Sequence, residues 1–477
     1  MPESFVRLLE AGARRWPDRP ALVWEGGSLG YALLHRRADS LARGHAAKGI
    51  RPGARIAVSI PNRWQFAVAL LGGWKLGATV APLDPLLKDN ECREILADLA
   101  PVVTIEEGDL DIGAGAGPSD RPTSDAPALI LYTSGSTGRP KGAIISHAAL
   151  AFANESWGGP VVGLTPGDVV LAALPLSHSF GLNAALLAPL LAGATVALIE
   201  RFSPETAVDA IRRHRVTVFP GVATMFRRIL DSPALARADL SSIRLAVSGA
   251  APCPWELARQ WRAETGIRIL RGYGMSELFR PISYLATDPA ESPTATGRPV
   301  PGVEARVADD AGRPLSAGET GELWIKTPAA MAGYLNDLEA TREVLTGDGW
   351  FRTGDLAVIA ANGRVEIVGR KRERILRGGY SVFPQEVEAV LLAHPAVAEA
   401  AVLGVPHPEL GEEVAAFVAL RPRAGATADE LIAHCRDRMA GFKYPRQVTI
   451  LPALPRSATG KILKSGLRAP RRAEPRT

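Results

Sequence analysis

Cysteine is scarce in this sequence, and the few cysteines lie far apart. The chain has three in 477 residues, Cys92, Cys253 and Cys435, with no CxxC pair among them. This spacing argues against a zinc site and against a disulfide framework, because both need clustered or paired cysteines. The scarcity fits a reducing compartment, so we expect a cytoplasmic protein.

Long hydrophobic runs and concentrated charge are missing as well. No uninterrupted apolar run approaches the roughly 18 residues of a membrane-spanning helix. The first residues lack the basic and apolar regions of a signal peptide, so we expect none. The net charge is +5, and the basic residues are dispersed apart from the tail at 468–476. We therefore expect neither a membrane span nor nucleic-acid binding.

The chain is instead rich enough in apolar residues to build large cores. Hydrophobic residues make up 47% and charged residues 22%, and the length exceeds that of one ordinary domain. Strand-like and helix-like segments alternate, for example a helix at 4–16, a strand at 56–60 and a helix at 254–265. This alternation predicts an α/β fold with parallel sheets, then a β-rich part from about residue 303 and a small α+β unit at the end.

A stretch rich in glycine and hydroxyl groups, YTSGSTGRPKG at 132–142, follows a short apolar run. Its glycines permit tight turns, its hydroxyls and backbone N–H groups can face an anion, and Lys141 adds positive charge. The stretch is not a Walker A motif, because Pro140 precedes the lysine and Gly142 follows it. Composition alone leaves open both a phosphate-binding loop and an ordinary solvent loop.

Further segments downstream carry groups suited to a nucleotide. Tyr273 is suited to stacking on a purine, Glu277 to holding Mg²⁺, and Asp355 to accepting two ribose hydroxyls. Taken singly, each could be an ordinary turn, cap or solvated residue. The segments read GAAP at 249–252, GYGMSE at 272–277, GWFRTGD at 349–355, GRKRERILRGGYSVFPQEVE at 369–388 and PRSATGKIL at 455–463.

Together and in this order, these segments resemble the signatures of the acyl-adenylate-forming (AMP-binding) enzymes, most closely the acyl-CoA synthetases. The resemblance covers essentially the whole chain. It implies a large multi-sheet N-terminal adenylation domain with a β-rich subdomain at 1–371, a hinge at Arg372, and a small mobile α+β lid domain at 373–477. Ser276 replaces the usual threonine and Glu373 the more common aspartate, so each position keeps its hydroxyl or its charge.

The resemblance also assigns roles to residues. The expected catalytic residues are Lys461, Glu277 and Thr133. Lys461 would bridge the acid's carboxylate and the α-phosphate of ATP, and Glu277 would hold Mg²⁺. Gly378, Gly379 and Tyr380 are expected on the side of the thiol, coenzyme A. The residues expected at ATP are Thr133, Ser134, Gly135, Ser136, Thr137, Gly138, Lys141, Gly249, Ala250, Ala251, Pro252, Gly272, Tyr273, Gly274, Met275, Ser276, Asp355 and Arg370.

The stretch LPLSHSFGLN at 174–183 is the expected substrate-side motif. No aspartate occurs between Leu171 and Leu187, which argues against an amino acid whose amine needs a partner. By resemblance, the acid pocket comprises His178, Phe180, Gly181, Gly221, Val222, Phe279 and Arg280. Phe279 would shorten the pocket, and Arg280 either pairs a second carboxylate on the substrate or faces solvent. Aryl, cinnamic, fatty and dicarboxylic acids all stay open.

The implied reaction has two steps. A carboxylic acid and ATP form an acyl-adenylate and pyrophosphate; the lid then rotates about Arg372, and a thiol takes the acyl group. Coenzyme A is the expected acceptor, because no carrier-protein segment follows Lys461. The alternative is a stand-alone acyl-AMP ligase that loads a phosphopantetheinyl carrier protein. Both a monomer and a homodimer are compatible with the sequence.

Two other classes of protein are alternatives to this interpretation. A GxSxG pattern at 26–30 matches the nucleophile turn of serine hydrolases, but so short a match arises easily by chance and an ordinary turn explains it. A non-catalytic nucleotide-binding module would be expected to lose Glu277 or Lys461, and both are present.

Overall fold

The computed structural model describes residues 3–110, 120–134, 140–289, 291–456 and 462–467. The chain forms two compact units. Unit 1 comprises Met1–Ala305 and Ile325–Arg352, and unit 2 comprises Arg306–Trp324 and Thr353–Thr477. This grouping puts residues 353–371 with the C-terminal part, although the sequence analysis places them before the hinge. The hinge at Arg372 itself stays a prediction.

The largest sheet of unit 1 has seven strands in the order β12-β11-β10-β8-β9-β1-β2. All neighbours pair in parallel except β1 and β2, which form an antiparallel hairpin. Its strands are β1 (Pro20–Trp24), β2 (Gly27–Gly30), β8 (Val169–Ala172), β9 (Thr195–Leu198), β10 (Val218–Gly221), β11 (Leu245–Ser248) and β12 (Ile269–Leu270). The α/β fold class predicted from the sequence is confirmed.

A second, six-stranded sheet has the order β18-β7-β6-β4-β3-β5. It is parallel from β6 to β5, and β6, β7 and β18 are antiparallel. Its strands are β3 (Arg55–Val58), β4 (Thr79–Pro82), β5 (Val103–Ile105), β6 (Pro127–Ser134), β7 (Pro140–Ser146) and β18 (Gly333–Tyr334). A short antiparallel sheet follows with β13 (Gly272–Met275), β14 (Phe279–Ser283) and β15 (Arg298–Pro299).

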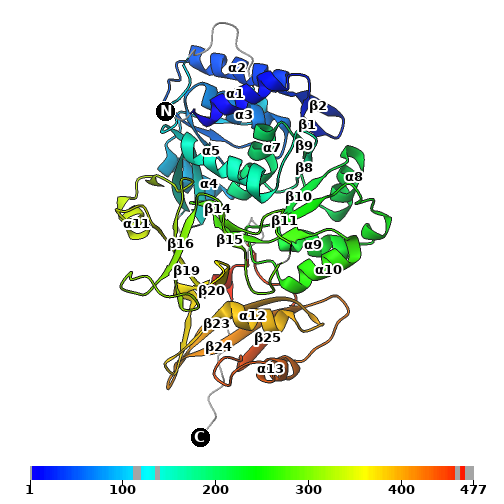
Figure 1. Cartoon of the computed structure of the whole chain (residues 1–477), viewed down its shortest axis with the longest axis vertical. Helices are drawn as coiled ribbons and strands as arrows, with labels where there is room; N and C mark the ends of the chain where they lie inside the picture. Colours follow the sequence, from blue (N-terminus) through cyan, green and yellow to red (C-terminus); the bar gives the residue numbers. More distant parts are fainter. Residues whose placement is uncertain (1–2, 111–119, 135–139, 290, 457–461, 468–477) are drawn as a thin grey trace. The chain divides into compact units, whose positions relative to one another are not determined.

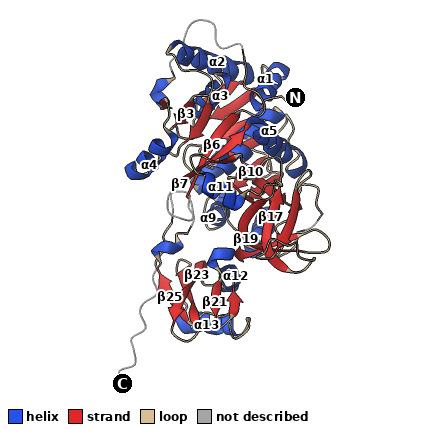
Figure 2. Ribbon diagram, turned by 90° about the vertical axis from the view of Figure 1, so that its left-hand side faces the viewer, coloured by secondary structure: helices blue, strands red, loops and turns tan. Residues whose placement is uncertain are grey.

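Helices accompany the sheets of unit 1 (Figures 1 and 2). They are α1 (Phe5–Arg15), α2 (Tyr31–Ala47), α3 (Trp64–Lys75), α4 (Asp89–Leu99), α5 (His147–Ser156), α6 (Ser179–Gly181), α7 (Ala188–Ala192), α8 (Pro204–His214), α9 (Ala223–Leu230), α10 (Trp255–Thr265) and α11 (Leu338–Val344). Two π-helical turns, η2 (Trp157–Val161) and η3 (Leu182–Leu187), continue α5 and α6. None of the described helices is both long and apolar enough to cross a membrane.

Local sequence signals explain where α8 begins and ends. Ser203 caps the helix, because its hydroxyl accepts a hydrogen bond from the Thr206 amide at 3.1 Å, and Pro204 occupies the first turn. Arg212, Arg213 and His214 occupy the last turn, where the partial negative charge of the helix end favours cations. These local signals account for the bounds of α8.

Unit 2 is built from two sheets and two helices. The four-stranded sheet β16-β17-β19-β20, which lies mainly in this unit, is formed by β16 (Glu304–Ala308), β17 (Thr320–Lys326), β19 (Phe351–Ile359) and β20 (Val365–Arg370). The second sheet comprises β21 (Ile375–Arg377), β22 (Tyr380–Val382), β23 (Val397–His407), β24 (Gly411–Leu420) and β25 (Gln447–Leu451), accompanied by α12 (Pro384–Leu392) and α13 (Ala428–Arg436). The small α+β unit predicted at the end of the chain is confirmed.

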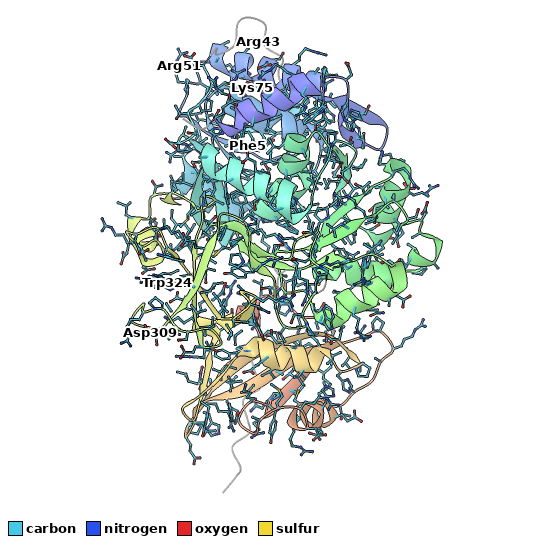
Figure 3. The ribbon with its side chains drawn as sticks, in the orientation of Figure 1. Phe5, Arg43, Arg51, Lys75, Asp309 and Trp324 are labelled. Carbon is cyan, nitrogen blue, oxygen red and sulfur yellow. The ribbon has the colours of Figure 1, made fainter. Side chains whose placement is uncertain are left out.

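A buried lysine joins the first three helices of unit 1. Lys75, at the end of α3, is only 2% exposed, and its Nζ lies 2.9 Å from Glu10 Oε1 on α1 and 2.8 Å from Asp39 Oδ1 on α2. Arg121 contacts the same two carboxylates at 2.8 and 3.2 Å. Burial raises the pKa of Glu10, but the bonds and charges of Lys75 and Arg121 outweigh burial and lower it. Figure 3 shows Phe5 of α1 and Lys75 in the same region of the unit.

We predict that Lys75→Met lowers the free energy of unfolding by about 3 kcal/mol, because it leaves partly buried carboxylates short of one partner. Urea unfolding followed by circular dichroism measures this. The lowered pKa of Glu10 means that its pairing stabilises the fold above about pH 4.5 and is lost as the pH falls through the folded-state pKa. The variant should therefore lose less stability than the wild type as the pH falls below about 4.5.

Lys88→Met, at an exposed lysine that precedes α4, is the matched control and should shift stability by less than about 0.5 kcal/mol. Equal stability of the Lys75→Met variant and the wild type at neutral pH would contradict the role given to this ion cluster.

Candidate active site

The predicted phosphate loop sits at the end of a β-hairpin. Strands β6 and β7 pair so that Thr133 faces Lys141 and Ser134 faces Pro140. The loop residues Gly135, Ser136, Thr137 and Gly138 lie outside the described residues, so their roles stay predictions. The loop thus joins two antiparallel strands, whereas a Walker A loop runs from a strand into a helix. In the described part of this hairpin, Lys141 supplies positive charge.

Lys141 and Glu277 meet at one tyrosine. Tyr334 lies on β18, which pairs with β7 and places Tyr334 opposite Ala143. The Tyr334 hydroxyl donates to Glu277 Oε1 at 3.0 Å, and Lys141 Nζ lies 5.3 Å from the centre of the Tyr334 ring. Lys141 Nζ also lies 3.5 Å from Asp337 Oδ2. The structure therefore brings together two predicted site residues that are 136 positions apart in the sequence.

Glu277 is nearly buried, at 6% exposed, and its backbone carbonyl accepts a hydrogen bond from the Met331 amide at 2.8 Å. Burial and the neighbouring Glu277 carboxylate raise the pKa of Tyr334, so its hydroxyl stays protonated and acts as a donor. One carboxylate beside a phosphate loop fits Mg²⁺, which commonly binds one or two carboxylates together with substrate phosphates. Among the described residues no cluster of three or more metal-ligating side chains occurs, so such a metal would depend on the nucleotide.

The substrate-side motif touches the same segment. Ser179 Oγ lies 3.1 Å from Ser276 Oγ, within hydrogen-bonding distance, and Ser276 immediately precedes Glu277. Asn62 holds the motif in place: its Nδ2 donates to the Leu174 carbonyl at 2.7 Å and its Oδ1 accepts from the Leu176 amide at 2.9 Å. Sequence reasoning missed Asn62, because a lone asparagine more than 100 residues upstream gives no local signal.

His178 has an acidic neighbour that the sequence did not reveal. Its Nε2 lies 3.5 Å from Asp84 Oδ2, in the loop after β4, and the Asp84 side chain is 8% exposed. Burial raises the pKa of Asp84, but His178 and the Leu86 amide, which donates to Asp84 Oδ1 at 2.9 Å, outweigh burial and lower it. An ionised Asp84 thus stands beside the imidazole and can orient it toward the predicted acid pocket.

The glycines of the predicted nucleotide and acid pockets lie where the neighbouring atoms leave no room for a side chain. A Cβ on Gly249 would lie 2.9 Å from the Phe180 ring, one on Gly272 2.4 Å from Arg280, and one on Gly274 2.0 Å from the Phe279 carbonyl. Any side chain at these positions would displace its neighbour. Ala250 (φ 62°) and Phe279 (φ 57°) have the left-handed backbone, a strain that often marks functional segments.

The remaining predicted residues of unit 1 lie on neighbouring strand ends. Gly221 ends β10 and faces Ser248 of β11, the residue before Gly249, and Val222 starts α9. Gly181 packs so closely that a Cβ would lie 2.2 Å from the Pro175 carbonyl. Tyr273 and Met275 lie on β13, and the residues Ala250, Ala251 and Pro252 are exposed beyond β11. This is the arrangement expected of parallel strands, whose carboxyl ends share one edge of the sheet.

Unit 2 carries the predicted ribose and thiol residues. Asp355 on β19 faces Arg370 on β20, and Arg370 Nε lies 3.5 Å from Asp355 Oδ1. Gly378 (φ 56°) and Gly379 (φ 83°) form the tight turn between β21 and β22, beside the exposed Tyr380. The Tyr380 ring stacks on Phe442 with centroids 4.6 Å apart. Lys461 lies outside the described residues, so its catalytic role stays a prediction.

The serine-hydrolase pattern does not form a nucleophile turn. Ser28 lies within strand β2, paired with Val23 of β1 in an antiparallel hairpin. A nucleophilic serine of that class would stand at a sharp turn between a strand and a helix. The structure therefore removes the hydrolase alternative.

Comparisons with known proteins agree with this geometry. The AMP-binding enzyme model matches residues 9–335, and the model of the AMP-binding enzyme C-terminal domain matches residues 386–461. The chain belongs to the AMP-binding enzyme family. The family resemblance seen in the sequence is thus confirmed.

Relatives share almost the whole length of this member of the family. A feruloyl-CoA synthase of an Amycolatopsis species is 36% identical over 482 residues, which is 96% of each chain. The ATP-bound structure of MatB from Rhodopseudomonas palustris is 32% identical, with a TM-score of 0.90 over 97% of this chain and 98% of that one. The anthranilate CoA ligase AuaEII in complex with anthranoyl-AMP is 27% identical, with a TM-score of 0.90 over 97% and 96%.

We predict that Asp84→Asn raises KM for the acid by about 3- to 10-fold and leaves kcat within about 2-fold of the wild type, since it removes the charge that orients His178. Acid-dependent pyrophosphate release at saturating ATP measures both constants.

Asp89→Asn, which alters an exposed carboxylate in the first turn of α4, serves as the control and should behave like the wild type. An unchanged KM in Asp84→Asn, or a fall in kcat alone, would contradict a positioning role for Asp84.

Proposed function

We propose that this chain is an acid–thiol ligase that makes an acyl-adenylate from ATP and a carboxylic acid, with release of pyrophosphate, and then transfers the acyl group to coenzyme A. The observation that carries the proposal is one continuous set of contacts in unit 1. It runs from Lys141 through Tyr334 to Glu277, and from the adjacent Ser276 through Ser179 to His178. The groups predicted to bind phosphate and those predicted to bind the acid are therefore neighbours, which supports the proposal.

The first step needs charge neutralisation and alignment more than a protein nucleophile. A carboxylate must approach the negatively charged α-phosphate, so the enzyme has to position both groups and offset their repulsion. Lys141 supplies positive charge at the hairpin, and Ser276 offers a hydroxyl to a phosphate oxygen. Glu277, held by Tyr334, is the residue that would hold Mg²⁺, which spreads the charge of the ATP phosphates when it is bound. Lys461 would bridge the two reacting groups.

The second step is assigned to the face of unit 2 that carries the glycine turn. Asp355 would bind the ribose hydroxyls, with Arg370 beside it, and the turn at Gly378 and Gly379 would lie along the pantetheine arm. We propose that rotation about Arg372 exchanges Lys461 for this turn between the two steps. The relatives named above as CoA ligases favour coenzyme A as the thiol; a phosphopantetheinyl carrier protein remains the alternative acceptor.

The acid is of the aryl or small-acid kind. Two relatives carry the names of aromatic acids, ferulate and anthranilate. Phe180 lies against Gly249, and Phe279 is buried at 6% exposed beside the same strands, so bulky groups limit the length of the pocket. Dependence on ATP and coenzyme A fits a cytoplasmic location.

The decisive test is pyrophosphate release from ATP with a panel of aryl, fatty and dicarboxylic acids, followed by detection of the thioester with and without coenzyme A. We predict that Lys461→Ala lowers pyrophosphate release by at least about 100-fold, as expected when a charge at the reacting atoms is removed. The same variant should largely retain thioester formation from supplied acyl-adenylate, because the second step does not use this lysine.

Lys326→Ala, at an exposed lysine that ends β17, is the control and should retain both steps. If Lys461→Ala lost both steps equally, the role assigned to Lys461 would be wrong. If no acid gave acid-dependent pyrophosphate release, the proposed ligase activity would be wrong.

A further inference from the structure

A small cavity lies next to the strands of the predicted acid pocket. Its volume is about 10 Å³, room for about one water molecule, and its wall includes Ser156, Trp157, Phe279 and Arg280. None of the residues that line it is acidic. The cavity therefore has a cation on its wall and no carboxylate to match it.

Two further donors line this cavity without a partner. Trp157 is 2% exposed, and its Nε1 makes no hydrogen bond within the described part of the chain. The buried Ser156 Oγ likewise has no partner there. An unpaired buried donor is costly, and native proteins pair nearly all of them. Trp157 Nε1 and Ser156 Oγ, both next to a guanidinium, therefore indicate a place that could take a hydrogen-bond acceptor.

Arg280 is held by neutral groups alone. Its Nη1 donates to the Ser248 carbonyl at 2.8 Å and its Nε to Ser283 Oγ at 3.0 Å, while Leu270 O is 3.5 Å from Nη2, at the limit of a hydrogen bond. No carboxylate in the described residues lies within 4.0 Å of the guanidinium; nearby Glu291 bonds to Arg268 and Arg271 at 3.0 and 3.1 Å.

A cation enclosed without a counter-ion is unfavourable, because burial removes its hydration. Arg280 keeps some exposed surface, yet enough protein surrounds its guanidinium that burial lowers its pKa to about 9. The group stays charged at neutral pH. The centre of the guanidinium also lies 5.2 Å from the centre of the Trp157 ring, so the two donors are near one another.

Contacts connect the cavity to the predicted acid pocket. Arg280 packs against the Cα of Gly272 and bonds to the carbonyl of Ser248, the residue before Gly249. The Phe180 ring packs against Gly249 and also meets the Trp157 ring edge-on, with centroids 5.8 Å apart. An acid that extends past Gly249 would therefore bring its far end toward Arg280. The Phe180 ring thus stands between Gly249 and Trp157, so it would have to turn aside to open a path to the cavity, and such side-chain changes are common on binding.

We propose that Arg280, Trp157 Nε1 and Ser156 Oγ form a subsite for a second anionic group at the far end of the substrate, so that the preferred acid is a short dicarboxylate. This inference rests on the proposed ligase activity and names its substrate class. Guanidinium and neutral N–H and O–H donors together match a carboxylate, and charge-assisted hydrogen bonds of this kind are among the strongest in proteins. Phe279, strained at φ 57° on the wall, fits a segment shaped by binding.

Matched pairs of acids test the subsite: succinate against butyrate, glutarate against valerate, and adipate against hexanoate. In each pair kcat/KM is measured by pyrophosphate release. We expect the wild type to prefer the dicarboxylate by at least about tenfold in one pair or more. Arg280→Met should lower kcat/KM for that dicarboxylate by at least about tenfold, through KM, and for its monoacid partner by less than about 3-fold.

Trp157→Phe keeps an aromatic ring and removes one donor, and Ser156→Ala removes the other. Each variant should lower kcat/KM for the dicarboxylate by about 3- to 10-fold and change kcat/KM for the monoacid little. These two variants decide the question if Arg280→Met does not fold, which circular dichroism reports. Arg306→Met, at an arginine that stacks on Trp324 in unit 2, is the matched control and should leave the preference unchanged.

Two results would overturn the proposal. One is a wild type that prefers the monoacid in all pairs. The other is a set of variants whose kcat/KM falls equally for both acids of a pair, which would mean that Arg280 only supports the local structure. Calorimetric titration of the same acids in the presence of a non-hydrolysable ATP analogue separates this failure from failure of the ligase. If no acid yields pyrophosphate, the proposed reaction fails, and the calorimetric preference still decides whether the subsite exists.

Discussion

The predicted site of unit 1 depends on the absence of side chains at three glycines, one directly after β11 and two within β13. At Gly249, Gly272 and Gly274 the space a Cβ would take is filled by the Phe180 ring, the Arg280 guanidinium and the Phe279 carbonyl. These close approaches set the positions of an aromatic wall, a buried cation and a strained turn at once. Because packed interiors have little free volume, a methyl group added at any one of these glycines would displace the group that faces it.

A second dependence joins segments that are distant in sequence. Strand β18 contributes only two residues to its sheet, yet it places Tyr334 where it meets both Lys141 and Glu277. This short strand thus links the hairpin of β6 and β7 to Glu277 through the Tyr334 side chain. In the described part of the hairpin, contacts with Tyr334 and Asp337 set the position of the Lys141 ammonium group.

The sequence predicts well what local chemistry determines. The helices predicted at 4–16 and 254–265 and the strand predicted at 56–60 correspond to α1, α10 and β3, with their ends within about two residues of those predicted. The sequence cannot predict contacts between segments that are far apart along the chain. Asp84 beside His178, Asn62 beneath the substrate-side motif and Tyr334 beside Glu277 each come from a remote segment, with no periodic or motif signal of their own. Gly135 to Gly138 and Lys461, predicted from their motifs, lie outside the described residues.

The turn between β21 and β22 has a consequence for how this protein can diversify. Arg377 and Tyr380 pair across a loop of two residues, and both of those residues, Gly378 and Gly379, have positive φ, as in the mirror-image turns of tight hairpins. Few substitutions are open to these two positions, so mutation there is constrained by backbone geometry alone. Sequence change in this hairpin would therefore accumulate at the flanking side chains, such as the exposed Tyr380, whose ring stacks on Phe442.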